Sequence, residues 1–224
     1  DLAPADVISI WAGVRPLVAG VGGKDPSAVS REHRIEARPD GVVIIAGGKL
    51  TTYRRMAGEC VDVAAAVLAT RGGPSRRSHP PTHRSHLPGA AGIESDSDLE
   101  ELAASLVASL GGDLEVARHL ALTYGARAPR VAALASDHPS RAGRISDGLP
   151  YCWAEIAFAA REEYALTLAD VMQRRTEVFY RSRDQGLSVA RAAASSLAAE
   201  LDWDKCEEDR QVEAYQCLVA ANQA

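Results

Sequence analysis

The first part of the chain shows short apolar runs that are separated by turn residues. Residues 7–17 combine β-branched and aromatic side chains with a glycine and a proline, which predicts a strand that runs into a turn. Weak alternation over residues 30–38, the turn residues at 39–41 and an apolar run at 42–46 predict a hairpin. Because the second run is continuously apolar, we expect its strand to be buried.

A glycine turn and a long helix follow this hairpin. The apolar run ends at Gly47 and Gly48, and Thr51 then opens a stretch in which the apolar residues share one helical face. That face carries Met56, Cys60, Val63 and Val67. Two glycines and a proline at residues 72–74 end the pattern, which therefore predicts a strand, glycine turn and helix unit.

After residue 98 the apolar positions recur every three or four residues, as they do in helices. Ser97 and Glu100 predict a capping box, and Asp113 is expected to cap the next helix, which ends at Gly125. A third, short helix is expected to begin near Pro129 and to lead into a polar loop. Four further helices are predicted over residues 151–165, from 167 to about 181, over 187–201 and from 204 onward.

These patterns predict an α+β chain that is mostly helical. Residues 74–98 are rich in proline, glycine and serine, and we interpret them as a surface linker and the domain boundary. Residues 1–73 then hold the hairpin and its helix, and residues 99–224 form an all-helical domain. A length of 224 residues fits one full domain with a smaller or incomplete piece.

The amino-acid composition is that of a globular protein. The chain is 46% hydrophobic and 25% charged, which is typical of a globular fold. Its sequence has neither a long apolar run nor a secretory leader, so we expect an intracellular protein. Its four cysteines follow no metal or disulfide spacing and are expected to be reduced thiols.

The charge is distributed unevenly. Residues 99–224 carry 13 Lys and Arg against 19 Asp and Glu, whereas residues 1–98 carry 12 against 11. An acidic helical domain lacks the positive field that nucleic acid requires, so we expect no nucleic-acid partner.

The glycine turn is the strongest candidate for a binding site. Gly47 and Gly48 allow another molecule to approach the backbone, and the start of the following helix offers unpaired N–H groups to an anion. Lys49 adds a full positive charge. The alternative is an ordinary sharp turn with a solvated lysine; the sequence does not form a P-loop.

Two arginines extend this candidate site. Arg15 lies between apolar residues and a proline, a setting that suits bidentate capture of phosphate or carboxylate. Arg31 has the same potential, although either arginine could instead pair with a structural carboxylate. His79, His83 and His86 lie among prolines without a cysteine or carboxylate ligand, so we expect no metal site.

Several motifs together resemble the C-terminal half of FAD-dependent glycerol-3-phosphate dehydrogenase. The front motifs are Ala12-Gly13-Val14-Arg15-Pro16-Leu17, Ser30-Arg31-Glu32-His33 and Gly47-Gly48-Lys49-Leu50-Thr51-Thr52-Tyr53-Arg54. The helical part matches at Leu149-Pro150-Tyr151, Ala154-Glu155-Ile156, Arg161-Glu162-Glu163 and Leu168-Ala169-Asp170-Val171-Met172-Gln173-Arg174-Arg175-Thr176. The resemblance covers essentially the whole chain.

The resemblance implies oxidation of sn-glycerol 3-phosphate to dihydroxyacetone phosphate, with FAD as cofactor and quinone as electron acceptor. It implies that Arg15 and Lys49 bind the substrate, with Arg31 as a third cation. Backbone contacts to the flavin would come from Gly47, Gly48, Leu50 and Thr51, and Lys49 would contact both the cofactor and the substrate. The general base is not assigned. A cytoplasmic location, contact with the cytoplasmic face of the membrane and a homodimer are further expectations of the resemblance.

One departure from that family concerns the cofactor. The sequence has no Gly-x-Gly-x-x-Gly motif to hold the FAD pyrophosphate. We therefore expect a C-terminal portion of the enzyme that is inactive alone. The alternatives are a relative among FAD-dependent amine or amino-acid oxidases and a non-catalytic helical interaction module.

Overall fold

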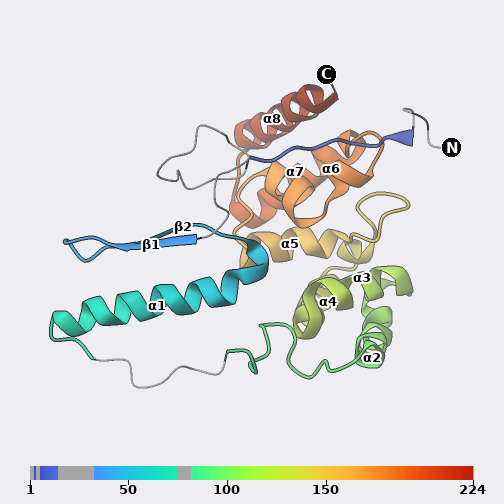
Figure 1. Ribbon diagram of the computed structural model, residues 1–224. Helices are drawn as coiled ribbons and strands as arrows, with labels where there is room; N and C mark the ends of the chain where they lie inside the picture. Colours follow the sequence, from blue (N-terminus) through green and yellow to red (C-terminus); the bar gives the residue numbers. More distant parts are fainter. Residues whose placement is uncertain (1–2, 4–5, 15–32, 75–81, 224) are drawn as a thin grey trace. The chain divides into compact units, whose positions relative to one another are not determined.

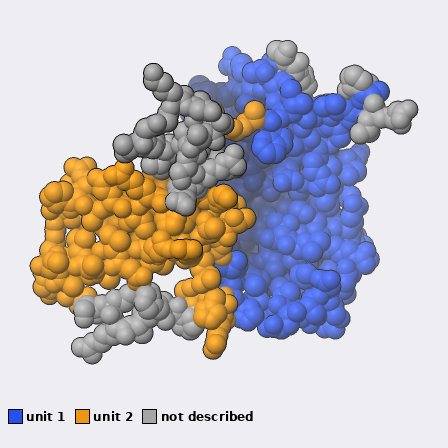
Figure 2. Space-filling view, in the orientation of Figure 1, with its two compact units in different colours: residues 1–11, 86–224 blue, residues 12–85 orange. Residues whose placement is uncertain are grey.

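The computed structural model describes residues 3, 6–14, 33–74 and 82–223, which belong to two compact units. The hairpin unit comprises residues 12–85, and the helical unit comprises residues 1–11 and 86–224 (Figure 2). The described part of the chain is mostly helical with a single two-stranded sheet (Figure 1). This confirms the predicted fold class.

The hairpin unit begins with strands β1 (His33–Ala37) and β2 (Val43–Gly47). They are antiparallel, with His33 opposite Gly47 and Ala37 opposite Val43. The backbone N–H of Arg38 donates to the Val42 carbonyl at 2.8 Å, which closes the turn predicted at residues 39–41. The left-handed backbone of this turn is supplied by Gly41, at φ +94°.

A 3₁₀ turn, η3 (Leu50–Thr52), leads into helix α1 (Tyr53–Thr70). The predicted apolar face of α1 is partly buried, but no described residue of the hairpin unit is fully buried. In β2, Ile44 and Ile45 remain 44% and 38% exposed. The prediction of a buried second strand is therefore wrong, because one helix cannot cover both faces of a two-stranded sheet.

The helical unit starts with α2 (Asp96–Leu106), η4 (Val107–Leu110), α3 (Leu114–Tyr124), η5 (Gly125–Arg127), α4 (Ala128–Asp137) and η6 (Pro139–Ala142). Asp113 caps α3 as predicted, accepting from the N–H groups of Glu115 and Val116, both at 3.1 Å. The capping box of α2 is instead formed by Ser95 and Asp98. Asp98 also accepts from the N–H of Glu94 at 2.7 Å, so the helix begins earlier than the predicted Ser97 and Glu100 box.

The second half of the helical unit contains α5 (Trp153–Glu162), the π-helix η7 (Asp170–Arg175), α6 (Val178–Arg181), α7 (Leu187–Leu201) and α8 (Lys205–Gln223). Helix α7 has the predicted bounds. Helix α5 is shorter than predicted, because Tyr164 adopts a left-handed backbone at φ +56° and the chain turns away there.

The helix predicted from residue 167 to about 181 is split in two. The Thr176 N–H and hydroxyl both donate to the Val171 carbonyl at 2.9 Å, which is the five-residue spacing of a π-helix. Glu177 then takes a left-handed conformation at φ +51° before α6 begins. The local side-chain bond of Thr176 thus competes with regular α-helical pairing.

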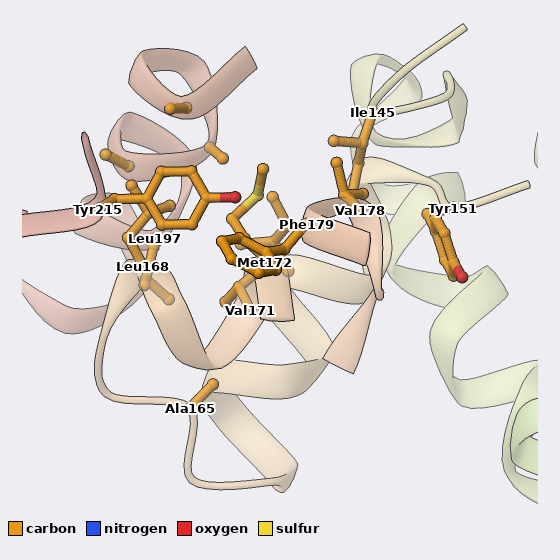
Figure 3. Packing of buried hydrophobic residues seen from close by; sticks show 14 of the residues in the cluster. Ile145, Tyr151, Ala165, Leu168, Val171, Met172, Val178, Phe179, Leu197 and Tyr215 are labelled. Carbon is orange, nitrogen blue, oxygen red and sulfur yellow. The ribbon is translucent and has the colours of Figure 1, made fainter. Parts of the chain in front are cut away.

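Helix α5 contributes to both apolar clusters of the helical unit. Ala154 and Phe158 pack with α2, α3 and α4, while Ile156 and Ala159 pack with α6, α7 and α8. In the second cluster Met172, Phe179, Leu197 and Tyr215 meet at the centre (Figure 3). Small alanines on α5 and α7 let the helices approach closely, as the alanine-rich sequence suggests.

A buried carboxylate joins α3 to α5. Glu155 is fully buried and accepts hydrogen bonds from His119 Nε2 at 2.8 Å, the Tyr124 hydroxyl at 3.1 Å and the Cys152 N–H at 2.8 Å. Burial, followed by the charge of Glu155, raises the pKa of Tyr124 far above its ordinary value. Because all its oxygens are paired, this carboxylate fixes how the two helices pack.

The segment at residues 7–14 is not a strand, contrary to the prediction over residues 7–17, whose remainder lies outside the described residues. A strand requires a neighbouring backbone to complete its hydrogen bonds. Here side-chain bonds hold the segment instead. The Ser9 hydroxyl donates to the Tyr180 carbonyl at 2.8 Å, and Asn222 Nδ2 donates to the Ile10 carbonyl at 3.0 Å.

Candidate functional site

The glycine turn between β2 and α1 has a backbone that only glycine adopts without strain. Gly47 and Gly48 lie at φ +77° and +84°, in the left-handed region. A Cβ on Gly48 would lie 2.5 Å from the Met56 side chain and 3.2 Å from the Cβ of His33. The space that a side chain at position 48 would need is therefore already occupied by Met56 and His33.

No described side chain caps the start of η3 or of α1. The residue before η3 is Lys49 and the residue before α1 is Thr52, and neither side chain caps the following helix. Both the N–H and the hydroxyl of Thr52 donate to the Lys49 carbonyl at 3.0 Å. No acidic residue lies in the first turn of η3 or α1, so the positive end of the helix dipole is not neutralised locally.

The residues around this opening are accessible. Lys49 and Thr51 are exposed, and Leu50 is 88% exposed. Backbone donors, a positive helix end and an ammonium group thus lie on one short segment. This arrangement fits an anion or the polar edge of a flavin ring, so the described residues are compatible with the implied cofactor.

The structure adds a polar pair that sequence reasoning did not assign. His33 Nε2 lies 2.6 Å from Glu59 Oε2, and Arg55 Nε donates to Glu59 Oε1 at 2.7 Å. Hydrogen bonds from Arg55 and then from His33 lower the pKa of the Glu59 carboxyl. The His33 side chain is 18% exposed and Glu59 is 41% exposed.

The predicted site residues fall into two groups. Gly47, Gly48, Lys49, Leu50 and Thr51 lie together at the glycine turn, and nothing in their geometry conflicts with the predicted role. Arg15 and Arg31 lie outside the described residues, so their roles stay predictions.

A metal centre is not found in the described ranges, where no three His, Cys, Asp or Glu residues lie close enough to hold an ion. Of the three histidines in the linker, His79 lies outside these ranges. His86 Nε2 lies 3.5 Å from Glu94 Oε1, which gives it a structural partner.

A comparison with protein families identifies the helical part of the chain. Residues 80–208 match the model of the C-terminal domain of alpha-glycerophosphate oxidase. The chain belongs to this family. The match confirms the resemblance inferred from the motifs, and it falls largely on the helical unit.

Relatives of the alpha-glycerophosphate oxidase C-terminal family extend the similarity to the glycine turn. "Glycerol-3-phosphate dehydrogenase 2" of Mycobacterium tuberculosis is 36% identical over 220 residues, covering 98% of this chain and 36% of the relative. The mitochondrial glycerol-3-phosphate dehydrogenase of Homo sapiens is 33% identical over 217 residues, covering 95% of this chain and 28% of the relative. The chain thus spans about a third of the length of these relatives.

A solved structure shows the same fold. The glycerol-3-phosphate dehydrogenase from Bacillus halodurans, crystallised with FAD, matches this chain with a TM-score of 0.66 at 24% identity. The match covers 83% of this chain and 36% of that chain.

Proposed function

We propose that this chain is the C-terminal part of an FAD-dependent dehydrogenase that oxidises sn-glycerol 3-phosphate to dihydroxyacetone phosphate. Family membership and the names of the relatives support the reaction. The observation that carries the proposal is the glycine turn, because its left-handed backbone and uncapped helix start suit contact with a flavin.

The oxidation removes two electrons and two protons from the secondary alcohol of the substrate, and FAD, when bound, supplies the two-electron acceptor. In this proposal Gly47, Gly48, Leu50 and Thr51 contact the flavin through their backbone, while Lys49 serves both ligands. Arg15 and Lys49 bind the substrate phosphate, with Arg31 as a further cation, since a dianion requires several positive donors. The general base is not among the residues assigned.

The proposed domains follow one another along the chain. We propose that residues 1–73 complete a flavin and substrate domain, that residues 74–98 are a linker and that residues 99–224 form the helical domain. By their contacts, residues 1–11 and 86–98 group with the helical unit, and α2 already begins at Asp96. The exposed apolar surface of the hairpin unit supports an incomplete domain, because Ile44, Ile45 and Leu50 would otherwise face water. We infer that the chain alone does not catalyse the reaction.

Quinone as acceptor, a cytoplasmic location, contact with the membrane surface and a homodimer are parts of the same proposal. None of the described helices is long and apolar enough to cross a membrane.

Substitution of Lys49 and Arg15 in the polypeptide that includes the remaining flavin domain tests the substrate assignment. Loss of one charge-assisted hydrogen bond should raise the KM for glycerol 3-phosphate about 10- to 100-fold in Lys49→Ala and in Arg15→Ala. Lys205→Ala is the control, because this exposed lysine of α8 pairs with Glu208 at 3.2 Å. An unchanged KM in both site variants would contradict the assignment, and flavin reduction by an amine instead would favour the related oxidases.

A further inference from the structure

His33 lies directly behind the glycine turn. It is opposite Gly47 in the β1–β2 register, and its Cβ is 3.2 Å from the position that a Gly48 Cβ would take. The Met56 side chain fills the rest of that position. His33 is thus on the α1 side of the turn, so a ligand must approach the Gly48 backbone from another side.

Glu59 connects His33 to α1. The 2.6 Å contact between His33 Nε2 and Glu59 Oε2 joins the first residue of β1 to the second turn of the helix. Arg55 lies one helical turn before Glu59 and donates to its other oxygen at 2.7 Å. The lowered pKa of Glu59 keeps this carboxylate ionised and able to accept both bonds.

The contact between His33 and Glu59 therefore links the two ends of the glycine turn. The turn begins at the end of β2, which pairs with β1, and it ends at the start of α1. A bond between β1 and α1 fixes the distance that residues 47–52 must span. No described residue of the hairpin unit is fully buried, so this polar contact adds a direct connection between β1 and α1 where packing is only partial.

We propose that His33 and Glu59 form a positioning pair that holds the Gly47–Thr51 segment in its ligand-binding conformation. His33 is a positioning residue because it acts through the turn. The ligand is FAD, and in this respect the inference rests on the proposed function.

The test compares four variants of the polypeptide that contains the complete flavin domain. His33→Ala removes the donor, and His33→Gln retains an N–H group that can reach the Glu59 carboxylate. Glu59→Gln weakens the acceptor with little change of shape. Arg34→Ala is the matched control, since Arg34 is the next residue of β1 and is 64% exposed.

Two properties are measured on each variant. Hydrogen exchange of the peptide that spans residues 47–52 reports the order of the turn without any ligand, and equilibrium titration gives the dissociation constant for FAD. We expect His33→Ala to speed exchange in this peptide and to weaken FAD binding about tenfold, while turnover per bound flavin stays unchanged at saturating FAD. His33→Gln should restore most of both losses, and Glu59→Gln should show smaller losses of both.

Three results would overturn the proposal. Unchanged exchange and FAD affinity in His33→Ala would show that the pair does not hold the turn. Equal losses in His33→Gln and His33→Ala would show that the donated hydrogen bond is irrelevant. A fall in turnover per bound flavin with normal affinity would place His33 in the chemistry instead.

The exchange measurement separates this inference from the proposed function. If the unaltered polypeptide bound no FAD, the proposed function would fail, whereas the exchange rates of the His33 variants would still decide whether the pair positions the turn. Should His33→Ala fail to fold, Glu59→Gln carries the comparison as the variant that weakens the bond, with His33→Gln as the variant that keeps it, because both retain a polar side chain of similar size.

Discussion

Two features of the candidate site require a glycine at position 48. Its backbone is left-handed, and the space that a side chain would need holds Met56 and His33. The conformational demand is the stricter of the two, because the end of the Met56 side chain is flexible and can move. Conformation therefore decides what a substitution here does.

Gly48→Ala should weaken FAD binding. A left-handed non-glycine residue costs about 1–2 kcal/mol, so the variant turn relaxes and the ligand must restore it, which raises the dissociation constant by about 5- to 30-fold. Equilibrium titration with FAD on the polypeptide with its complete flavin domain measures this change.

Gly58→Ala is the control for that substitution. Gly58 lies within α1 and no atom outside its own helix would touch an added Cβ. Alanine is the better helix former by about 0.5–1 kcal/mol, so this variant should bind FAD normally. Equal losses in the two variants would show that α1, and not the turn conformation, controls binding.

At the scale of elements, Asp184 organises the start of α7. Its carboxylate accepts from the Ser182 hydroxyl at 2.5 Å, the Gly186 N–H at 2.9 Å and the Ser188 N–H at 2.8 Å. Burial alone would raise the pKa of Asp184, but these hydrogen bonds together outweigh it and lower the pKa well below its ordinary value of 3.8. The ionised form therefore stabilises the folded chain.

Asp184→Asn should make the free energy of unfolding less dependent on pH in the acidic range. A depressed pKa gives stabilisation that is present above the unfolded value, near pH 4, and is lost as the pH falls toward the folded value. We expect the variant to be less stable by about 1 kcal/mol at pH 7 and the difference to shrink below about pH 4. Urea unfolding of the chain followed by circular dichroism from pH 7 to 2 measures this, with Asp147→Asn in an exposed loop as control. A difference that is constant over this range would refute the explanation.

The sequence predicted best those elements whose ends carry local signals. Asp113 and the glycine turn mark helix starts through a capping side chain and through backbone freedom, so the sequence predicts α3 and α1 from local signals. The split near Thr176 was missed because a π-helix depends on one side-chain bond that competes with an otherwise helical pattern. The predicted capping box of α2 lies two residues too far along the chain, because Ser95 and Ser97 are equally good caps in the sequence.

The candidate site was predictable only in part for a related reason. Glycines and a lysine after an apolar run indicate a ligand-binding turn from neighbouring residues alone. His33 and Glu59 are 26 residues apart, and their contact depends on how α1 lies on β1, which no local pattern encodes. Likewise β2 looks buried in sequence but remains exposed, because the single helix α1 cannot cover both faces of the two-stranded sheet.

At the scale of the whole molecule, the two units differ in how they are stabilised. The helical unit has two apolar clusters and a fully paired buried carboxylate, whereas the hairpin unit has an exposed apolar surface. This contrast supports the proposal that a helical domain is joined to part of a larger flavin domain. We therefore expect flavin chemistry to require more protein than these 224 residues.

Anaerobic reduction of bound flavin tests this central claim most directly. The polypeptide extended upstream of Asp1 and the 224-residue chain are each mixed with FAD, and visible absorption is followed as glycerol 3-phosphate is added. We expect the flavin to bleach with the extended polypeptide only. Flavin that binds to the extended polypeptide and is not reduced by glycerol 3-phosphate would contradict the assigned substrate, and bleaching with the short chain would contradict its incompleteness.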